Sequence, residues 1–297
     1  MQTLTSNRNI ITAALILMGL PLLWLTILTL SIDFPWDSES AKIVNKTSWQ
    51  LSFGETKYWY LIINISAFFF PFVLSFDKKV HFYKKWRFLF PAIGIVGAFF
   101  ILWDVYFTHL GIWGFNARYF NYTLLGLPLG EWLFFITVPY CCVFVHECLL
   151  CYFSTDPLKK YDRAIGITLV GFFLLIGLLN ATKAYTAWTF LLAAGFVAFH
   201  YYALPNHYRT RFYIAYLICL IPFVLVNGIL TGAFNEEPVV IYNNAHNSQH
   251  FLGTRLLTIP YDDVFYGFLL IFMNVTLYEW AKAKKKAAKI DHLSKNH

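Results

Sequence analysis

Eight apolar runs, each long enough to cross a bilayer as a helix, constrain the fold of this chain more than any other feature. A helix needs about 20 apolar residues to span roughly 30 Å of hydrocarbon. The runs lie near residues 10–32, 58–76, 88–108, 125–153, 164–181, 187–204, 212–232 and 257–281. Only 13% of the residues are charged, whereas about a quarter are charged in a soluble domain. We therefore predict an all-α integral membrane protein with about eight transmembrane helices.

The basic residues predict how these helices are oriented. If the N-terminus is cytoplasmic, most of the 23 Lys and Arg residues fall on the cytoplasmic side, in agreement with the positive-inside bias of membrane proteins. We therefore expect an integral protein of the cell (inner) membrane with both termini cytoplasmic. The basic run from Lys282 to Lys289 directly follows the last apolar run. We assign it to anionic lipid headgroups and not to nucleic acid.

Two short segments repeat 132 positions apart, and each opens a long apolar run. The segment Gly126-Leu127-Pro128-Leu129-Gly130-Glu131-Trp132 matches Thr258-Ile259-Pro260-Tyr261-Asp262-Asp263-Val264. Four crossings separate the two segments, so both copies have the same orientation in the membrane. This predicts two tandem repeats with same-orientation topology. Residues 1–155 hold the first four helices, and residues 156–297 hold the last four and a basic cytoplasmic tail.

Both segments place carboxyl groups in the first turn of a helix that lies in hydrocarbon. The helix N-terminus favours the ionised form by up to about 2 kcal/mol, whereas burial against apolar side chains favours the neutral acid. A neutral acid in an aromatic pocket can give its proton to a substrate that is itself a hydrocarbon. The candidate catalytic residues are Glu131, Asp262 and Asp263. The candidate substrate contacts are the neighbouring aromatic side chains Trp132, Phe134, Phe135, Phe265 and Tyr266.

The acids of the predicted helices allow further hypotheses about their roles. Glu131 and Asp263 are expected to face each other across a pseudo-twofold axis, one protonated and one ionised. Asp104 lies at about the same depth, and a catalytic role and a structural hydrogen-bonding role are both open. Its counterpart in the second copy is near Asn227 or Gly228, neither of which is an acid. The pair Glu147 and Glu279 lies one membrane thickness away and is expected to reach the lipid headgroups.

The sequence also gives expectations for one hydrophilic loop and for the cysteines. The hydrophilic loop from Asn235 to Arg255 is read as a solvated connection, with a lid over the active site as the alternative. The five cysteines all fall inside predicted helices and lack paired ligand motifs. They are expected to be free thiols that pack as small apolar residues.

The two acidic motifs also carry a family resemblance. At Pro128-Leu129-Gly130-Glu131-Trp132-Leu133-Phe134-Phe135 and at Ile259-Pro260-Tyr261-Asp262-Asp263-Val264-Phe265-Tyr266-Gly267, the chain resembles the membrane-bound lycopene cyclases of the heterodimeric type, in their fused two-domain form. Each helical domain of that family bears a Pro-x-Glu-(Glu/Asp) signature. The resemblance covers nearly the whole chain, and its specificity rests on the two motifs in tandem.

The resemblance implies a reaction and a set of site residues. It implies cyclisation of the acyclic ends of lycopene to β-ionone rings, through γ-carotene to β-carotene, by acid-initiated carbocation chemistry without net redox change. Glu131, Asp262 and Asp263 carry over to the acidic positions of the family. Gly130 stands where the signature has its first Glu, and Asp262 replaces Glu in the second copy. A different carotenoid end group therefore stays open as the substrate.

The implied partners are a lipophilic polyene, lycopene, and the lipid bilayer, and association with other enzymes of carotenoid synthesis is compatible with this role. No cofactor and no metal are expected. A di-iron enzyme would need several His clusters, whereas His246 and His250 form a single pair. There is no Lys within a predicted helix for a retinal Schiff base and no Gly-x-Gly-x-x-Gly flavin motif.

A membrane proton or solute transporter is the main alternative from another functional class. Acids inside the membrane in a tandem repeat also suit ion binding. Transport sites near the bilayer midplane usually need polar residues and helix breaks at that depth. The predicted helices contain few of either, which favours the enzyme.

Overall fold

The computed structural model describes residues 56–204, 207–235, 237–242 and 250–295. The apolar run predicted near residues 10–32 lies outside the described residues. Each of the other seven predicted runs corresponds to a helix. These are α2 (Trp59–Leu74), α3 (Trp86–His109), α4 (Leu129–Tyr152), α5 (Asp162–Leu179), α6 (Ala184–Ala203), α7 (Arg209–Leu230) and α8 (Tyr261–Lys295).

The lengths and surfaces of these helices agree with a membrane protein. Within the described residues, five helical segments are long and apolar enough to cross a bilayer: Phe82–His109, Leu129–Tyr152, Lys159–Leu179, Arg209–Leu230 and Tyr261–Ala288. Large apolar side chains such as Phe70 on α2, Leu179 on α5 and Ile221 on α7 are exposed, as expected of faces that contact lipid. The count of eight crossings and their orientation stay predictions.

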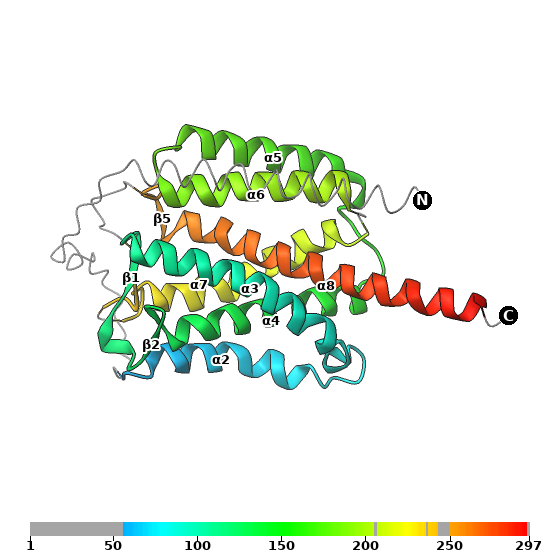
Figure 1. The fold of residues 1–297 in the computed structure, drawn as a ribbon, viewed down its shortest axis with the longest axis horizontal. Helices are drawn as coiled ribbons and strands as arrows, with labels where there is room; N and C mark the ends of the chain where they lie inside the picture. Colours follow the sequence, from blue (N-terminus) through cyan, green and yellow to red (C-terminus); the bar gives the residue numbers. More distant parts are fainter. Residues whose placement is uncertain (1–55, 205–206, 236, 243–249, 296–297) are drawn as a thin grey trace.

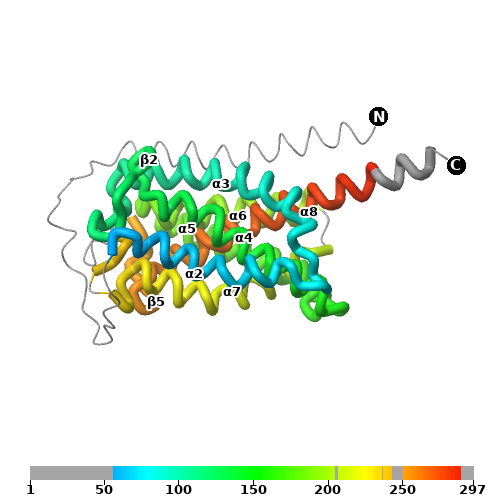
Figure 2. Tube along the Cα trace, turned by 90° about the horizontal axis from the view of Figure 1, so that it is seen from below, coloured from blue at the N-terminus to red at the C-terminus, as the bar shows by residue number. Residues whose placement is uncertain are grey.

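The helices run side by side along the long axis of the molecule (Figure 1). Helices α5 and α6 pack against each other, as do α2 and α4. The pair α5 and α6 lies along one side of the bundle and α2 along the opposite side, with the other helices between them (Figure 1). All the short strands gather at one end of the bundle, and Figure 2 shows the same grouping from below. We call this end the strand end.

Helix α8 is longer than the sequence predicts. The apolar run ends near residue 281, but the helix continues to Lys295 and projects beyond the bundle at the end opposite the strands (Figure 1). The extension is rich in Ala and Lys, both good helix formers. Helix propensity therefore prolongs α8 after the apolar run has ended.

The strands are short but join parts of the chain that are far apart in sequence. Strand β1 (Trp113–Phe115) pairs antiparallel with β4 (Val240–Tyr242), and Trp113 lies opposite Tyr242. Two small hairpins precede the acidic helices: β2 (Thr123–Leu124) pairs with β3 (Leu127–Pro128), and β5 (Arg255–Leu256) pairs with β6 (Ile259–Pro260). The described part of the chain is mostly helical, as predicted, but the prediction of an all-α chain omits these short strands.

The two hairpins agree in register as well as in place. Their strand pairs lie 132 positions apart, the same offset as the acidic motifs. The first turn residue of each hairpin, Leu125 and Leu257, has a left-handed backbone with φ of 55° and 58°, a conformation uncommon for residues other than glycine. Both acidic motifs therefore begin with the same local structure. The division of the chain at residues 155 and 156 stays a prediction.

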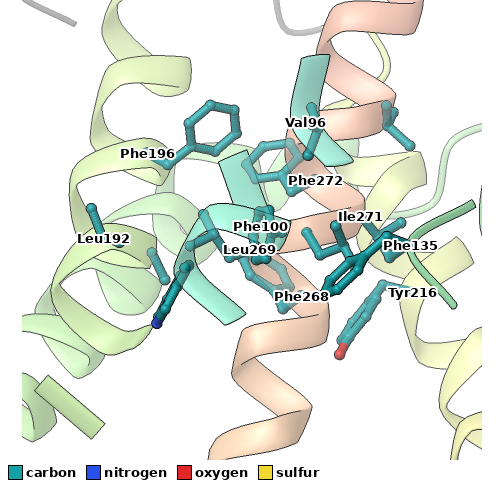
Figure 3. Close-up of a cluster of buried hydrophobic side chains, with 14 of the residues drawn as sticks. Val96, Phe100, Phe135, Leu192, Phe196, Tyr216, Phe268, Leu269, Ile271 and Phe272 are labelled. Atoms are coloured by element: carbon teal, nitrogen blue, oxygen red, sulfur yellow. The ribbon is translucent and has the colours of Figure 1, made fainter. Parts of the chain in front are cut away.

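Aromatic and aliphatic side chains fill the middle of the bundle. Figure 3 shows part of this core, contributed by α3, α4, α6, α7 and α8. The rings of Phe212 and Phe272 stack at a centroid distance of 4.5 Å with an interplanar angle of 10°. Interiors packed in this way leave few voids for water. The core therefore separates the strand end from the opposite end of the molecule.

Candidate active site

A cavity at the strand end brings three carboxyl groups together. It contains about 630 Å³ of space not filled by protein atoms, part of it open to the outside. Asp104 of α3, Glu131 of α4 and Asp263 of α8 line it. The other lining residues are mostly aromatic or apolar: Tyr60, Trp113, Phe115, Phe134, Val138, Tyr185, Phe223, Asn227, Leu230, Val240, Tyr242, Tyr266, Gly267 and Leu270. Three acids thus share one largely apolar chamber.

Glu131 is held by a tyrosine from the first described helix. It lies in the first turn of α4, is 8% exposed, and accepts a hydrogen bond from Tyr60 Oη. A Cβ atom added at Gly130 would lie 2.6 Å from Cδ1 of Tyr60, closer than side chains tolerate. The absence of a side chain at Gly130 therefore leaves room for the Tyr60 ring over the start of α4.

Asn64 and Thr137 fix the same contact between α2 and α4. The Asn64 amide donates to the carbonyl oxygens of Tyr60 and Gly130, both at 3.0 Å. Thr137 Oγ1 in turn donates to Asn64 Oδ1 at 2.8 Å. Both side chains are buried, and paired polar groups in such a place hold two helices in register. Glu131 is consequently positioned by a network and not by a single contact.

Asp263 accepts three hydrogen bonds from uncharged donors. Tyr185 Oη donates to Oδ1 at 2.8 Å, while Asn227 Nδ2 and Tyr242 Oη donate to Oδ2, each at 2.8 Å. These donors come from α6, α7 and β4. Burial, followed by the nearby Asp263 carboxylate, raises the pKa of Tyr242 well above its ordinary value. The Tyr242 phenol therefore keeps its proton and remains a donor.

Asp104 lies beside Glu131 and is only partly satisfied. Its Oδ1 accepts hydrogen bonds from Trp113 Nε1 at 2.5 Å and from Thr108 Oγ1 at 3.3 Å. Its Oδ2 is buried and has no hydrogen-bond partner within the described residues. The Asp104 and Glu131 carboxyl groups line the same cavity, near enough for their charges to influence each other. This leaves one oxygen of Asp104 free for an additional bond at the cavity.

Asp262, although adjacent to Asp263 in the sequence, is not among the residues that line the cavity. It is completely buried and accepts hydrogen bonds from Thr186 Oγ1 at 2.6 Å and from the Leu252 backbone N–H at 3.0 Å. Neighbouring residues of a helix point about 100° apart, which separates the two aspartates. Asp262 joins α8 to the start of α6 and to the loop before β5.

Only some of the aromatic residues predicted as substrate contacts line the cavity. Phe134 and Tyr266 line the cavity. Phe135 is buried in the core (Figure 3), and the Phe265 ring packs 4.6 Å from that of Phe190. Trp132 Nε1 donates to the Leu124 carbonyl at 3.1 Å and so supports the β2–β3 hairpin. Trp113 and Tyr242, which the sequence did not single out, line the cavity instead.

The prediction that Glu147 and Glu279 reach the lipid headgroups is wrong. Both are buried. Glu147 pairs with Lys85 and Lys282 and accepts a hydrogen bond from Tyr278 Oη at 2.6 Å. Glu279 lies 2.9 Å from Lys282 Nζ and 3.3 Å from His146 Nε2. Basic partners from neighbouring segments retain these acids inside the bundle, because a buried charge is stable only when it is paired.

The loop from Asn235 to Arg255 is also more than a solvated connection in its described parts. Val239, His250 and Phe251 are buried, and Val240 and Tyr242 line the cavity. Pairing of β4 with β1 brings these residues over the site. Residues 243–249, which include His246, lie outside the described residues. The five cysteines are free thiols, as predicted.

Comparison with known families shows which family the chain belongs to. The family described as lycopene cyclase matches the chain twice, at residues 57–149 and at residues 182–281. The chain belongs to the lycopene cyclase family. The two matched regions of the chain contain one acidic motif each, which is consistent with the two-domain, tandem form of the family. Searches of the curated proteins and of the solved structures gave no match.

Several residues that line the cavity were not found from the sequence. Tyr60 and Tyr185 are each the second residue of a helix, α2 and α6, but nothing in their surroundings distinguishes them from other tyrosines. Asn227 was visible only as the repeat counterpart of Asp104. In the described part of the chain, no group of His, Cys, Asp and Glu side chains is arranged to hold a metal ion.

Proposed function

We propose that this family member converts the acyclic ends of lycopene to β-ionone rings, through γ-carotene to β-carotene. The observation that carries the proposal is the meeting of Asp104, Glu131 and Asp263 in one largely aromatic and apolar cavity. Membership of the lycopene cyclase family supports carotenoid cyclisation in general. The choice of the β ring follows the resemblance of the two motifs.

The proposed reaction moves one proton in and one proton out. A carboxylic acid protonates the terminal double bond of the polyene and leaves a tertiary cation. The neighbouring double bond attacks this cation, which closes the ring and moves the positive charge onto a ring carbon. Loss of a proton from the ring carbon that bears the polyene chain forms the β double bond. Nothing is oxidised or reduced, and the substrate and product are isomers.

The cavity residues suit both halves of this reaction. Glu131, Asp263 and Asp104 are the carboxyl groups that face the substrate in the proposal. Phe134, Trp113 and Tyr266 line the same space, and aromatic faces stabilise a nearby cation. Asp262 is not among the residues that line the cavity and accepts hydrogen bonds from Thr186 and Leu252, so we assign it to support of the site. Of the predicted aromatic contacts, Phe134 and Tyr266 are retained as substrate contacts.

The sharing of one cavity by both acidic motifs has a consequence for the order of events. Both acidic motifs contribute to the same chamber, so one end of the polyene reacts at a time. A bicyclic product then requires release of the monocyclic compound and entry of the second end. We expect γ-carotene to appear before β-carotene in a time course.

Expression in cells that accumulate lycopene tests the proposal. The extracted pigment is expected to change from lycopene to monocyclic and then bicyclic β-ring carotenoids, which separate by chromatography. The matched control is the Glu131→Gln protein, quantified in the same membranes. Unchanged lycopene in cells whose membranes contain the folded parent protein would refute the proposal. Rings of another type would retain cyclisation and reject the β assignment.

A further inference from the structure

The two halves of the cavity present their acids in chemically different settings. In the first half, Glu131 stands beside a second carboxyl group, Asp104 of α3. In the second half, the corresponding place beside Asp263 holds the amide of Asn227 on α7, at 2.8 Å. A tyrosine near the start of α2 or α6 completes each half, Tyr60 for Glu131 and Tyr185 for Asp263. The two arrangements therefore differ mainly by an acid in place of an amide.

The difference determines which half retains a proton. Two adjacent carboxyl groups away from water resist double ionisation, so the pair holds one proton between them. Asp104 Oδ2, buried and without a partner in the described part of the chain, is available to share it with Glu131. Asp263 has no acid in the matching place and accepts from Asn227, Tyr185 and Tyr242 instead. Three donors on one carboxylate stabilise its ionised form.

The hydrogen bonds also leave Asp263 able to accept one more proton. A carboxylate has about four acceptor positions, two on each oxygen. Asn227 and Tyr242 occupy both positions of Oδ2, whereas Oδ1 receives only Tyr185 among the residues that the structure describes. One acceptor position of Oδ1 is therefore free of these donors. The three hydrogen bonds hold the carboxylate in one orientation at the cavity wall, so this position keeps a constant direction.

We infer that the halves divide the reaction, with the Asp104–Glu131 pair as proton donor and Asp263 as the carboxylate that deprotonates the ring cation and selects the ring double bond. This inference rests on the proposed cyclisation. The proton leaves the pair for the CH carbon of the terminal double bond, which leaves the tertiary cation, and after ring closure a C–H bond breaks and its proton passes to Asp263 Oδ1. Asp263 then releases a proton and the pair regains one through water at the open side of the cavity. Tyr242 is a positioning residue, because it acts through Asp263.

The ratio of ring isomers distinguishes these roles from general damage to the site. Loss of a proton from the carbon that bears the chain gives a β ring, loss from the other ring neighbour gives an ε ring, and loss from the methyl group gives an exocyclic alkene. A donor acts before the cation forms and cannot influence that choice. A base acts after the cation forms and does influence it.

The experiment compares Asp104→Asn with Asp263→Asn in lycopene-accumulating cells, by total rings per protein and by ring-isomer ratio. Asp104→Asn is expected to lower total cyclisation by about tenfold or more and to keep the parent ratio. Asp263→Asn is expected to lower cyclisation and to change the ratio severalfold. Asp263→Glu and Tyr242→Phe both retain a carboxyl group at position 263, in a shifted position. They are expected to change the ring-isomer ratio while forming more product than Asp263→Asn.

Tyr278→Phe is the matched control, because Tyr278 also donates to a buried carboxylate but lies at the opposite end of the bundle. It is expected to keep both rate and ratio. The inference is overturned if Asp263→Glu and Tyr242→Phe both keep the parent ratio, if Tyr242→Phe forms no rings, or if Asp104→Asn changes the ratio. A parent protein that forms no rings at all would instead refute the proposed function, so the two failures are distinguishable.

Discussion

Glu131 of α4 and Asp263 of α8 lie at the strand end, and each is followed sixteen residues later by a second acid, Glu147 or Glu279, in a different environment. Glu131, Asp263, Glu147 and Glu279 are all buried. At the strand end the hydrogen-bond donors are phenols and an amide. At the opposite end, the donors include the ammonium groups of Lys85 and Lys282.

Under the proposed function, this contrast means that burial and residue type alone do not make an acid catalytic. A carboxylate with a cationic partner stays ionised, because its charge is balanced, and its role is structural. A carboxyl group with only neutral partners keeps the choice between its two protonation states. The packed core between the ends (Figure 3) keeps the two kinds of site apart.

The largest effect is expected from Glu131→Gln. The amide preserves the shape and can still accept the hydrogen bond from Tyr60, but it has no acidic proton. We expect cyclisation per molecule to fall about a hundredfold or more, with the thermal unfolding midpoint in detergent within a few degrees of the parent. A variant that retains most of its activity would remove Glu131 from the chemistry.

The next effect is expected from Glu147→Gln at the opposite end, and it should fall on stability. Lys85 and Lys282 would lose their shared counter-ion, which costs about 1–3 kcal/mol of unfolding free energy. Cyclisation per folded molecule should stay within about twofold of the parent, because the site lies beyond the packed core. Denaturant unfolding and pigment assays on the same preparation measure both quantities. Loss of activity without loss of stability would contradict the comparison.

Gly130→Ala tests how closely Tyr60 must approach α4. The added Cβ would press on the Tyr60 ring, and such overpacking costs about 1–3 kcal/mol. We expect cyclisation to fall as Tyr60 moves away from Glu131. Gly171→Ala in α5 is the matched control, since a Cβ there meets nothing within 4 Å; it should be neutral or stabilising by up to about 1 kcal/mol. Equal effects of the two substitutions would remove the special role of Gly130.

The smallest effects are expected from two tyrosine substitutions. Tyr278→Phe removes one donor from Glu147 and should lower the unfolding free energy by about 1 kcal/mol with unchanged cyclisation. Tyr60→Phe removes one donor from Glu131 and should change the rate of cyclisation more than it changes stability. Measuring the cyclisation rates and the unfolding midpoints of both variants checks whether one substitution acts mainly on stability and the other mainly on the rate. Similar changes in both properties would show that the two ends do not differ as proposed.

Much of the fold follows from the distribution of apolar residues along the chain. Runs of about twenty apolar residues must form helices in hydrocarbon, because the backbone groups have no other partners there. The matching acidic motifs likewise indicated the family and placed Glu131 and Asp263 at the starts of two helices. These features depend on residues close together in sequence, so they could be read without coordinates.

The partners of each acid depend on contacts between distant segments and could not be read in this way. Asp262 and Asp263 are adjacent in sequence, yet the rotation of the helix directs only Asp263 to the cavity. Tyr242 reaches Asp263 because β4 pairs with β1, and Lys85 reaches Glu147 from another helix. Local composition specifies that a helix forms and where it begins. The packing of helices against one another specifies which side chains meet, and with them the chemistry of the site.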